Sequence, residues 1–383
     1  MPSAQRMMTL ESWMISISTT NPGPTRRKQC LIQLILILTV FIISCGEAVC
    51  DPPAIPSVEK WQPPQTPGLH LILDQPDSKR EIFSVIRIPD GLMIGDYGSN
   101  VGGASVQMFD GQLTPDGQFP KAESVFDLYM PEDGLALCTN EHYGVIRKRV
   151  SVGMWEVMYK TSEDLDLMFF IRRAGNNLYA NWMTYGTGIG GIVKGDLNGN
   201  NWSEIVRYTN KAMPGMYSDG TNIYMAGATG SWPGNGYPIL TDFSGNIISG
   251  RSDSPNYKYW GIAKFNDLFI LGTVSYVSSG GKAKDSHIDV FDGTKNTTVW
   301  TNERTVIHRI EVYEDKVYAV VTWDWDADSN KTTLLMSSPD GYNWSVVVEI
   351  PCPHIIGMSF ADGGVYLMGG RYQDYGRVYF FKF

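Results

Sequence analysis

The sequence predicts an all-β protein, a seven-bladed β-propeller whose blades are four-stranded and antiparallel. A short turn followed by a strand recurs seven times, and the first strand residues lie 43 to 49 positions apart. A second series of turns keeps the same spacing, and this period fits one four-stranded blade. The first strand residues of the seven repeats are Leu92, Leu135, Leu178, Ile223, Leu268, Val317 and Val365.

The turn residues predict how the strands of each repeat are joined. Asp-Gly and Asn-Asn pairs between alternating apolar residues are typical of β-hairpins. If the strands are lettered A to D from the channel outward, the A–B and C–D turns are short and the B–C connections are long. Loops on a rigid scaffold often carry binding residues, so we expect the B–C loop face to be the working face.

The last repeat predicts how the ring closes. It supplies only three strands before the chain ends at Phe383. The segment 68–74 lies outside the repeats, and its apolar residues predict a strand. We expect this segment to complete the last blade, because closure leaves no long sheet edge open to aggregation.

The first 67 residues differ from the rest. Basic residues 26–28 precede an apolar run at 31–44, which predicts an export signal over residues 1–44. The run is short for a membrane-spanning helix. Residues 42–45 resemble the lipobox of bacterial lipoproteins, which implies lipidation of Cys45 and a lipid-anchored protein of the cell envelope. An uncleaved signal anchor and a secreted protein are the alternatives. Residues 45–67 are rich in proline and predict a tether, and residues 68–383 form the propeller.

The charge balance excludes one class of partner. The chain has 31 Lys and Arg residues against 40 Asp and Glu residues, a formal net charge of −9. An acidic surface repels phosphates, so nucleic acid is not an expected ligand. We expect a glycan or an extracellular protein as the partner, and membrane contact only through the lipid or signal anchor.

One predicted C–D turn carries a family resemblance. Residues 338–344 read Ser-Pro-Asp-Gly-Tyr-Asn-Trp, in which Asp340 and Trp344 resemble the Asp-box (BNR) turn of the sialidase-like propeller superfamily. Its spacing is one residue shorter than the commonest form. The resemblance implies a propeller fold and leaves the activity open.

The register of the A strands predicts which residues line the central channel. Counted back from the first residue of each B strand, positions −9, −7 and −5 are mostly apolar and are expected to pack within and between blades. Positions −8 and −6 alternate with them and should face the channel. Two acids, two arginines and aromatic walls favour an anionic or hydroxylated ligand, although a water-filled channel would also tolerate such charges. The predicted ligand-binding residues are Asp127, Tyr129, Arg172, Tyr217, Trp260, Arg309 and Glu311.

Two further motifs lie in B–C loops. His142 and Tyr143 are candidates for catalysis, because some seven-bladed lyases and glycosidases use His and Tyr on this face. Asp324, Asp326 and Asp328 stand at alternate positions, as carboxylates do in calcium loops, and Ca²⁺ is the one cofactor that the sequence suggests. The alternative is a solvated acidic loop.

Together these patterns predict an exported propeller that recognises a ligand, first a glycan, on its B–C loop face and channel mouth without catalysis. The alternative is a glycan-cleaving enzyme, a polysaccharide lyase or glycosidase, that uses the same face.

Overall fold

The computed structural model describes residues 60–383, apart from residues 99–100, 133, 141, 143, 164, 232–235, 255, 276–284, 324–329 and 372–374. The predicted leader, Cys45, Tyr143 and the three aspartates Asp324, Asp326 and Asp328 therefore lie outside the described residues. Residues 60–383 form one compact unit. No helix long and apolar enough to cross a membrane occurs in the described part of the chain.

The described residues form seven four-stranded antiparallel sheets, which confirms the predicted fold class. Six blades consist of four consecutive strands, and the seventh joins β1 to the last three strands. In blade order, the strands are β2 (Glu81–Ile88), β3 (Gly91–Tyr97), β4 (Ala104–Phe109) and β5 (Leu113–Phe119); β6 (Val125–Glu132), β7 (Leu135–Asn140), β8 (Val145–Ser151) and β9 (Met154–Lys160); β10 (Asp166–Ala174), β11 (Asn177–Thr184), β12 (Gly190–Asp196) and β13 (Ser203–Tyr208); β14 (Lys211–Ser218), β15 (Ile223–Thr229), β16 (Pro238–Asp242) and β17 (Ile247–Gly250); β18 (Tyr257–Phe265), β19 (Leu268–Ser275), β20 (Asp285–Phe291) and β21 (Asn296–Glu303); β22 (Thr305–Tyr313), β23 (Lys316–Trp323), β24 (Thr333–Ser338) and β25 (Ser345–Ile350); β26 (His354–Ala361), β27 (Gly364–Arg371), β28 (Tyr375–Lys382) and β1 (Gly68–Gln75).

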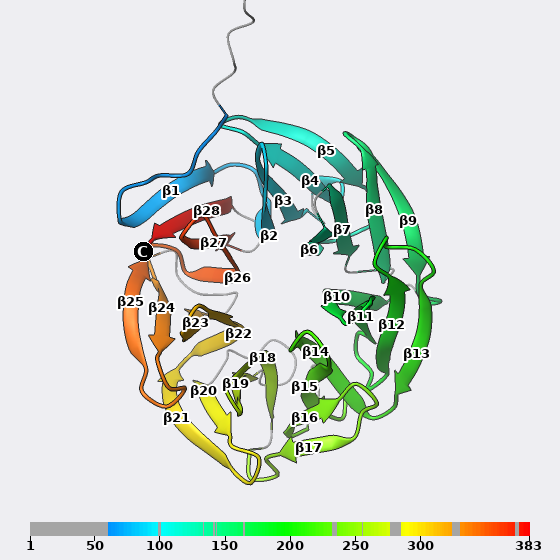
Figure 1. Ribbon diagram of the computed structural model, residues 1–383, viewed down its shortest axis with the longest axis vertical. Helices are drawn as coiled ribbons and strands as arrows, with labels where there is room; N and C mark the ends of the chain where they lie inside the picture. Colours follow the sequence, from blue (N-terminus) through cyan, green and yellow to red (C-terminus); the bar gives the residue numbers. More distant parts are fainter. Residues whose placement is uncertain are drawn as a thin grey trace, which may run out of the picture. The chain divides into compact units, whose positions relative to one another are not determined.

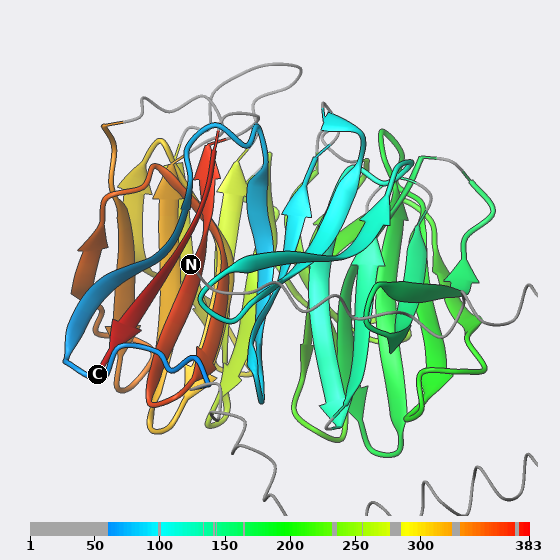
Figure 2. The ribbon, with the colours of Figure 1, turned by 90° about the horizontal axis from the view of Figure 1, so that it is seen from above.

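The blades surround a central axis, with the A strands β2, β6, β10, β14, β18, β22 and β26 innermost (Figure 1). Seen from the side, the strands run between two faces of the ring (Figure 2). Because neighbouring strands are antiparallel, the A–B and C–D turns share one face, and the B–C and D–A connections share the other.

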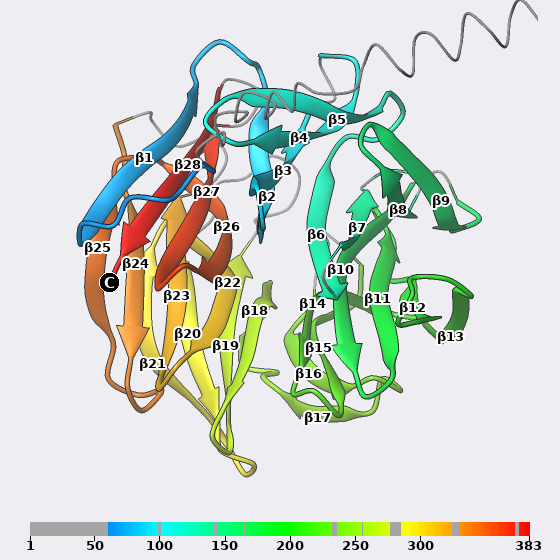
Figure 3. The same ribbon diagram turned by 45° about the horizontal axis from the view of Figure 1, so that its top comes forward.

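The ring closes where the two ends of the propeller meet. Strand β1 lies along β28 at the outer edge of the last blade (Figure 3), with Gly68 opposite Lys382. Near the other end of this pair, Arg377 Nε donates to Asp74 Oδ1 at 3.0 Å. The predicted closure by segment 68–74 is confirmed.

Two C–D turns share a hydrogen-bonding pattern. Asp340 Oδ1 accepts the backbone N–H groups of Asn343 and Tyr342, both at 2.8 Å, and these bonds lower the pKa of its carboxyl. Trp344 Nε1 then donates to the carbonyl of Gly341 at 3.0 Å. In the blade of β10, Trp202 Nε1 donates to Gly199 in the same way, also at 3.0 Å. The tryptophan of each turn therefore ties the following strand to the turn.

Every A strand contains a break in its pairing register, as a β-bulge produces. In β6, for example, the break lies between Val125 and Asp127, with Phe126 inside it. On the N-terminal side of the bulge, side chains therefore face the opposite way from the prediction. Phe126 was predicted to pack within and between blades, but its side chain points to the axis.

The evidence for this orientation is a contact across the ring. The rings of Phe126 and Trp260 stack with centroids 6.1 Å apart, although two blades separate their strands. They belong to one buried apolar cluster, the axial cluster, with members from all seven A strands. The cluster closes the channel at the level of the bulges. Its members at or beside the bulges are Phe83, Phe126, Phe169, Phe170, Met213, Trp260, Val306 and Ile356.

Candidate functional site

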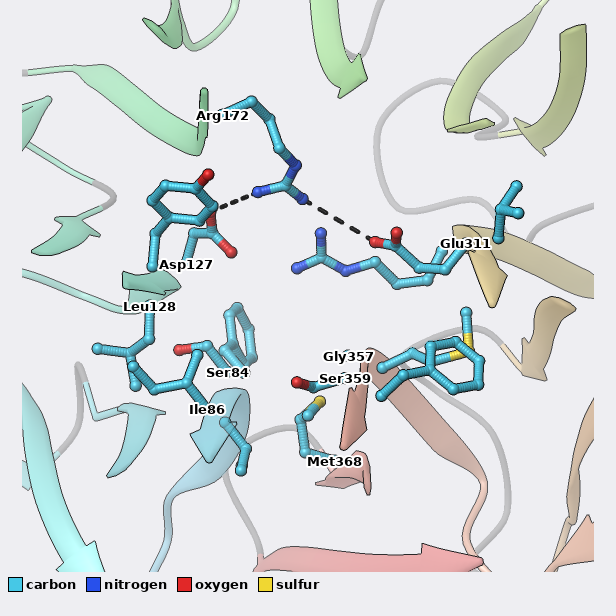
Figure 4. Close-up of a pocket in the computed structure, with 16 residues that line it drawn as sticks. Ser84, Ile86, Asp127, Leu128, Arg172, Glu311, Gly357, Ser359 and Met368 are labelled. Atoms are coloured by element: carbon cyan, nitrogen blue, oxygen red, sulfur yellow. Dashed lines mark hydrogen bonds and ion pairs between the residues drawn. The ribbon is translucent and has the colours of Figure 1, made fainter. Parts of the chain in front are cut away.

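A cavity of about 320 Å³ occupies the central channel beside the axial cluster. Its walls come from five A strands and from Met368 of β27. The charged side chains of Asp127, Arg172 and Glu311, from three different blades, point into it (Figure 4). A volume of this size suits a small ligand. The lining residues are Phe83, Ser84, Val85, Ile86, Asp127, Leu128, Tyr129, Arg172, Arg309, Glu311, Val312, Gly357, Met358, Ser359, Phe360 and Met368.

The cavity lies on the half of the channel that leads to the A–B turns. Apart from Phe83, its lining residues on the A strands follow the bulges, as Arg309 to Val312 do in β22. The axial cluster lies on the other side, towards the B–C loops. The sequence predicts that these residues line the channel and that recognition takes place on the B–C loop face and at the channel mouth. In the structure, five of the seven predicted residues line this cavity on the side of the A–B turns.

The polar centre of the cavity is Arg172 on β10. Its Nη1 donates to Asp127 Oδ2 at 2.9 Å, and its Nη2 lies 4.0 Å from Glu311 Oε1 (Figure 4). The same oxygen of Asp127 accepts the backbone N–H of Ile171 at 2.9 Å. Burial disfavours the charge of Arg172, but the two carboxylates outweigh this effect and raise the pKa of the guanidinium.

The second guanidinium, that of Arg309 on β22, is nine-tenths buried, with 9% of the residue exposed. Its Nε donates to the carbonyl of Ile356 at 3.2 Å, and its Cζ lies 4.2 Å from the ring centroid of Phe170. A cation held over an aromatic face gains a modest electrostatic stabilisation. Burial lowers the pKa of Arg309 to about 10.

The second acid beside Arg172 is Glu311, which lies 4.0 Å from it. Loss of hydration in the cavity raises the pKa of Glu311, and the charges of Arg172 and Arg309 offset only part of that increase. Burial likewise raises the pKa of Tyr129. The cavity thus holds one carboxylate tightly bound by donors and a second that takes up a proton more readily than an exposed glutamate.

Two predicted channel residues lie outside the cavity lining. The hydroxyl of Tyr217 donates to the carbonyl of Lys264 at 3.2 Å. Trp260 belongs to the axial cluster, where its ring lies 4.6 Å from that of His308. The other five residues of the predicted set, Asp127, Tyr129, Arg172, Arg309 and Glu311, converge on the cavity.

The loop candidates lie elsewhere. His142, on the B–C side of the ring, pairs its Nε2 with Glu123 Oε2 at 2.9 Å and is not among the residues that line the cavity. In the described ranges, no group of three or more His, Cys, Asp or Glu side chains is arranged to hold a metal ion. The predicted calcium loop falls outside those ranges.

The apolar wall of the cavity was not predicted as part of the site. Leu128, Met358 and Phe360 occupy the register positions expected to pack between blades, and they also border the cavity. Strand alternation assigns each residue either to the packing between blades or to the channel. A side chain at a blade junction can contact both the neighbouring blade and the cavity, so alternation alone does not predict this second contact.

Comparison with known proteins supports the fold alone. No protein-family model and no curated protein matches the chain. Virginiamycin B lyase from Staphylococcus aureus is similar in structure, with a TM-score of 0.54 and 13% identity over 82% of this chain and 98% of that chain. YCF48 from Cyanidioschyzon merolae gives a TM-score of 0.52 and 12% identity over 82% and 99% of the two chains. Sqt1 from Saccharomyces cerevisiae gives 0.51 and 6% over 83% and 100%.

Proposed function

We propose that this protein binds a small hydroxylated ligand, first the terminal sugar of a glycan, in the central cavity without changing it chemically. The observation that carries the proposal is the convergence of Asp127, Arg172 and Glu311, from three blades, beside an apolar wall. Charged groups of this kind hydrogen-bond hydroxyl groups, and an apolar wall contacts the C–H face of a sugar ring.

The closed end of the cavity favours a chain end over an internal stretch. A polymer bound by its middle must leave the site in two directions, and the axial cluster blocks one of them. A terminal residue needs only the opening towards the A–B turns. The ligand class proposed is therefore a free small molecule or the end of a chain.

A catalytic reading has its own support. Asp127 and Glu311 are both close to Arg172. Burial raises the pKa of Glu311, while Asp127 accepts hydrogen bonds from Arg172 and from the backbone N–H of Ile171. Two carboxyl groups in unlike environments are the requirement for acid and base roles in glycoside hydrolysis. The second candidate function is therefore a glycosidase that removes terminal sugars. The fold does not distinguish between ligand binding and glycoside hydrolysis, since propellers resembling this one include a lyase and proteins of other kinds.

A glycan array combined with a depolymerisation assay tests both functions. The cavity variants are Asp127→Asn and Glu311→Gln, and His142→Ala on the B–C side is the control. We expect binding that both cavity variants weaken and the control retains, with no new reducing ends. New reducing ends that vanish in Glu311→Gln would establish the second candidate instead. Binding lost only in His142→Ala would place the site on the B–C loops and overturn both.

We also propose that the protein is exported and lipid-anchored through Cys45, on the strength of its basic and apolar leader. Expression in a bacterial host with radiolabelled palmitate tests this. We expect label on the wild type and none on Cys45→Ser. An unlabelled wild type recovered from the membrane would favour the signal anchor.

A further inference from the structure

We infer that Arg309 is an anion-binding subsite of the cavity and that the ligand carries one carboxylate, which binds the terminal amino groups of this arginine. The inference rests on the proposed function, since it names the chemical class of the ligand that the cavity takes.

The first observation is that Arg309 has no direct carboxylate partner, although the charges of Asp127 and Glu311 act on it from farther away. Among the described residues, its only hydrogen bond is the one from Nε to Ile356, and no carboxylate lies within ion-pair distance. The terminal amino groups are left to the cavity that the residue lines. A buried unpaired charge is strongly unfavourable, so its presence beside a cavity points to a partner that is supplied from outside.

Three other enclosed arginines of this chain show direct pairing with a carboxylate. Arg80, Arg149 and Arg251 each hold a buried aspartate, with N–O distances of 2.7 to 2.9 Å. Within the cavity, Arg172 has Asp127 in direct contact. Arg309 differs from these four arginines in its deeper burial and in having no carboxylate within ion-pair distance.

The geometry favours a carboxylate over other anions. The guanidinium is fixed at Nε and lies over the face of Phe170, so its free edge carries two terminal amino groups. Such an edge matches the two oxygens of a carboxylate. A phosphate monoester would bring a second negative charge close to Glu311 and Asp127. A single negative charge is the better complement.

Glu311 makes this binding pH-dependent. The charged and titratable groups that face it are Arg172 on β10, Asp127 on β6, Tyr217 on β14 and Arg309 on its own strand. A ligand carboxylate at Arg309 adds a negative charge beside Glu311 and so raises its affinity for a proton. We expect binding to take up a proton, and affinity to rise as the pH falls.

Thermal unfolding of the wild type with matched probes tests the subsite. The probes are glucuronate against glucose, galacturonate against galactose, acetate against chloride, and glucose 6-phosphate as the phosphate arm. We expect the carboxylates to raise the unfolding temperature more than their matched controls, and Arg309→Met to remove the difference. Equal stabilisation by acids and neutral sugars, or none by any carboxylate, would overturn the subsite. A preference for the phosphate would also overturn it. The array result judges the proposed function independently.

Thermal unfolding without ligand shows whether the Arg309→Met variant is folded. Because the charge of Arg309 is unpaired, Arg309→Met should unfold at the same or a higher temperature than the ligand-free wild type. Arg149→Met is the matched control, and it should unfold at a lower temperature because it strands buried Asp116. Equal losses in the two variants would show that the charge of Arg309 is compensated within the protein, and the inference would fail.

The proton uptake is measured by calorimetric titration of the best carboxylate probe in buffers of different ionisation enthalpy. We expect the affinity to rise with falling pH, by at most about tenfold per pH unit for one linked proton. Glu311→Gln should flatten this dependence. A wild-type affinity that is constant with pH, or a Glu311→Gln variant that keeps the wild-type pH dependence, would contradict the role of Glu311.

Discussion

Phe126 and Trp260 stack across the axis of the ring, with centroids 6.1 Å apart, although they belong to blades that are not neighbours. This contact lies across the central channel and divides it into two parts. It closes the channel on the side of the B–C loops and leaves a charged cavity on the side of the A–B turns. It also links two blades that are not neighbours in the ring.

The axial cluster should contribute strongly to stability. Phe126→Ala removes a buried ring and is expected to lower the free energy of unfolding by about 3 to 5 kcal/mol. The exposed Tyr342 is the control, and Tyr342→Ala should change it by less than about 0.5 kcal/mol. Urea unfolding measures both. A small effect of Phe126→Ala would show that the cluster does not brace the ring.

The closing strand offers a matched pair of leucines. Leu73 is buried against β28 and its neighbours, whereas Leu71 is exposed on the same strand. Leu73→Ala should lower the free energy of unfolding by about 2 to 5 kcal/mol. Leu71→Ala should stay within about 0.5 kcal/mol of the wild type. Equal effects at the two positions would mean that β1 is not packed as the structure shows.

Asp127 is expected to serve stability and binding together. Asp127→Asn weakens the bond to Arg172 and leaves a guanidinium less well compensated, so unfolding should become easier by about 1 to 3 kcal/mol. The control is Asp253→Asn, which removes an exposed ion pair with Arg251 that contributes about 0 to 1 kcal/mol. Denaturant unfolding gives the stabilities, and titration with the array ligand gives the affinities. Full affinity in the Asn variant would separate Asp127 from the site.

Acidity should destabilise the fold through His308. Burial, together with the charges of His354 and Arg309, lowers the pKa of His308 well below its usual value near 6.5. Below pH 6.5 the unfolded chain therefore binds a proton that the folded chain refuses, so stability falls as the pH falls. The loss reaches about 1.4 kcal/mol per pH unit.

Unfolding between pH 7.5 and 5.5 measures this effect. His308→Gln should reduce the slope of stability with pH. The control is Leu71→Ala, which changes an exposed side chain without removing a titratable group and should leave the slope unchanged. An unchanged slope in His308→Gln would assign the acid sensitivity to another group.

Much of this architecture is visible in the sequence, because repetition is a strong signal. The spacing of residues such as Leu92 and Leu135 predicts the blades, and the strand missing from the last repeat predicts the closure. The same register places Arg172 and Glu311 in the channel, since strand residues alternate between faces. Their meeting in one cavity follows from the ring, which brings together strands that are distant in sequence.

The bulges account for what could not be predicted. No turn residue marks the break at Phe126, so its side chain was assigned to a blade junction. A prediction that does not include the bulges shows no closed end of the channel. It therefore cannot decide which face of the ring leads to the cavity. The B–C loops are long, so the sequence favoured their face as the binding face, whereas Asp127 and its neighbours line a cavity on the side of the A–B turns. The alternation of side chains along a strand identifies the residues that face the channel, but it does not give their position along the channel axis.

The most direct test of the central claim is a crystal structure with the array ligand bound. We expect ligand density in the central cavity, on the A–B side of Phe126, with hydrogen bonds to Arg172 or Glu311. Density confined to the B–C loops, with the cavity holding only water, would contradict the account.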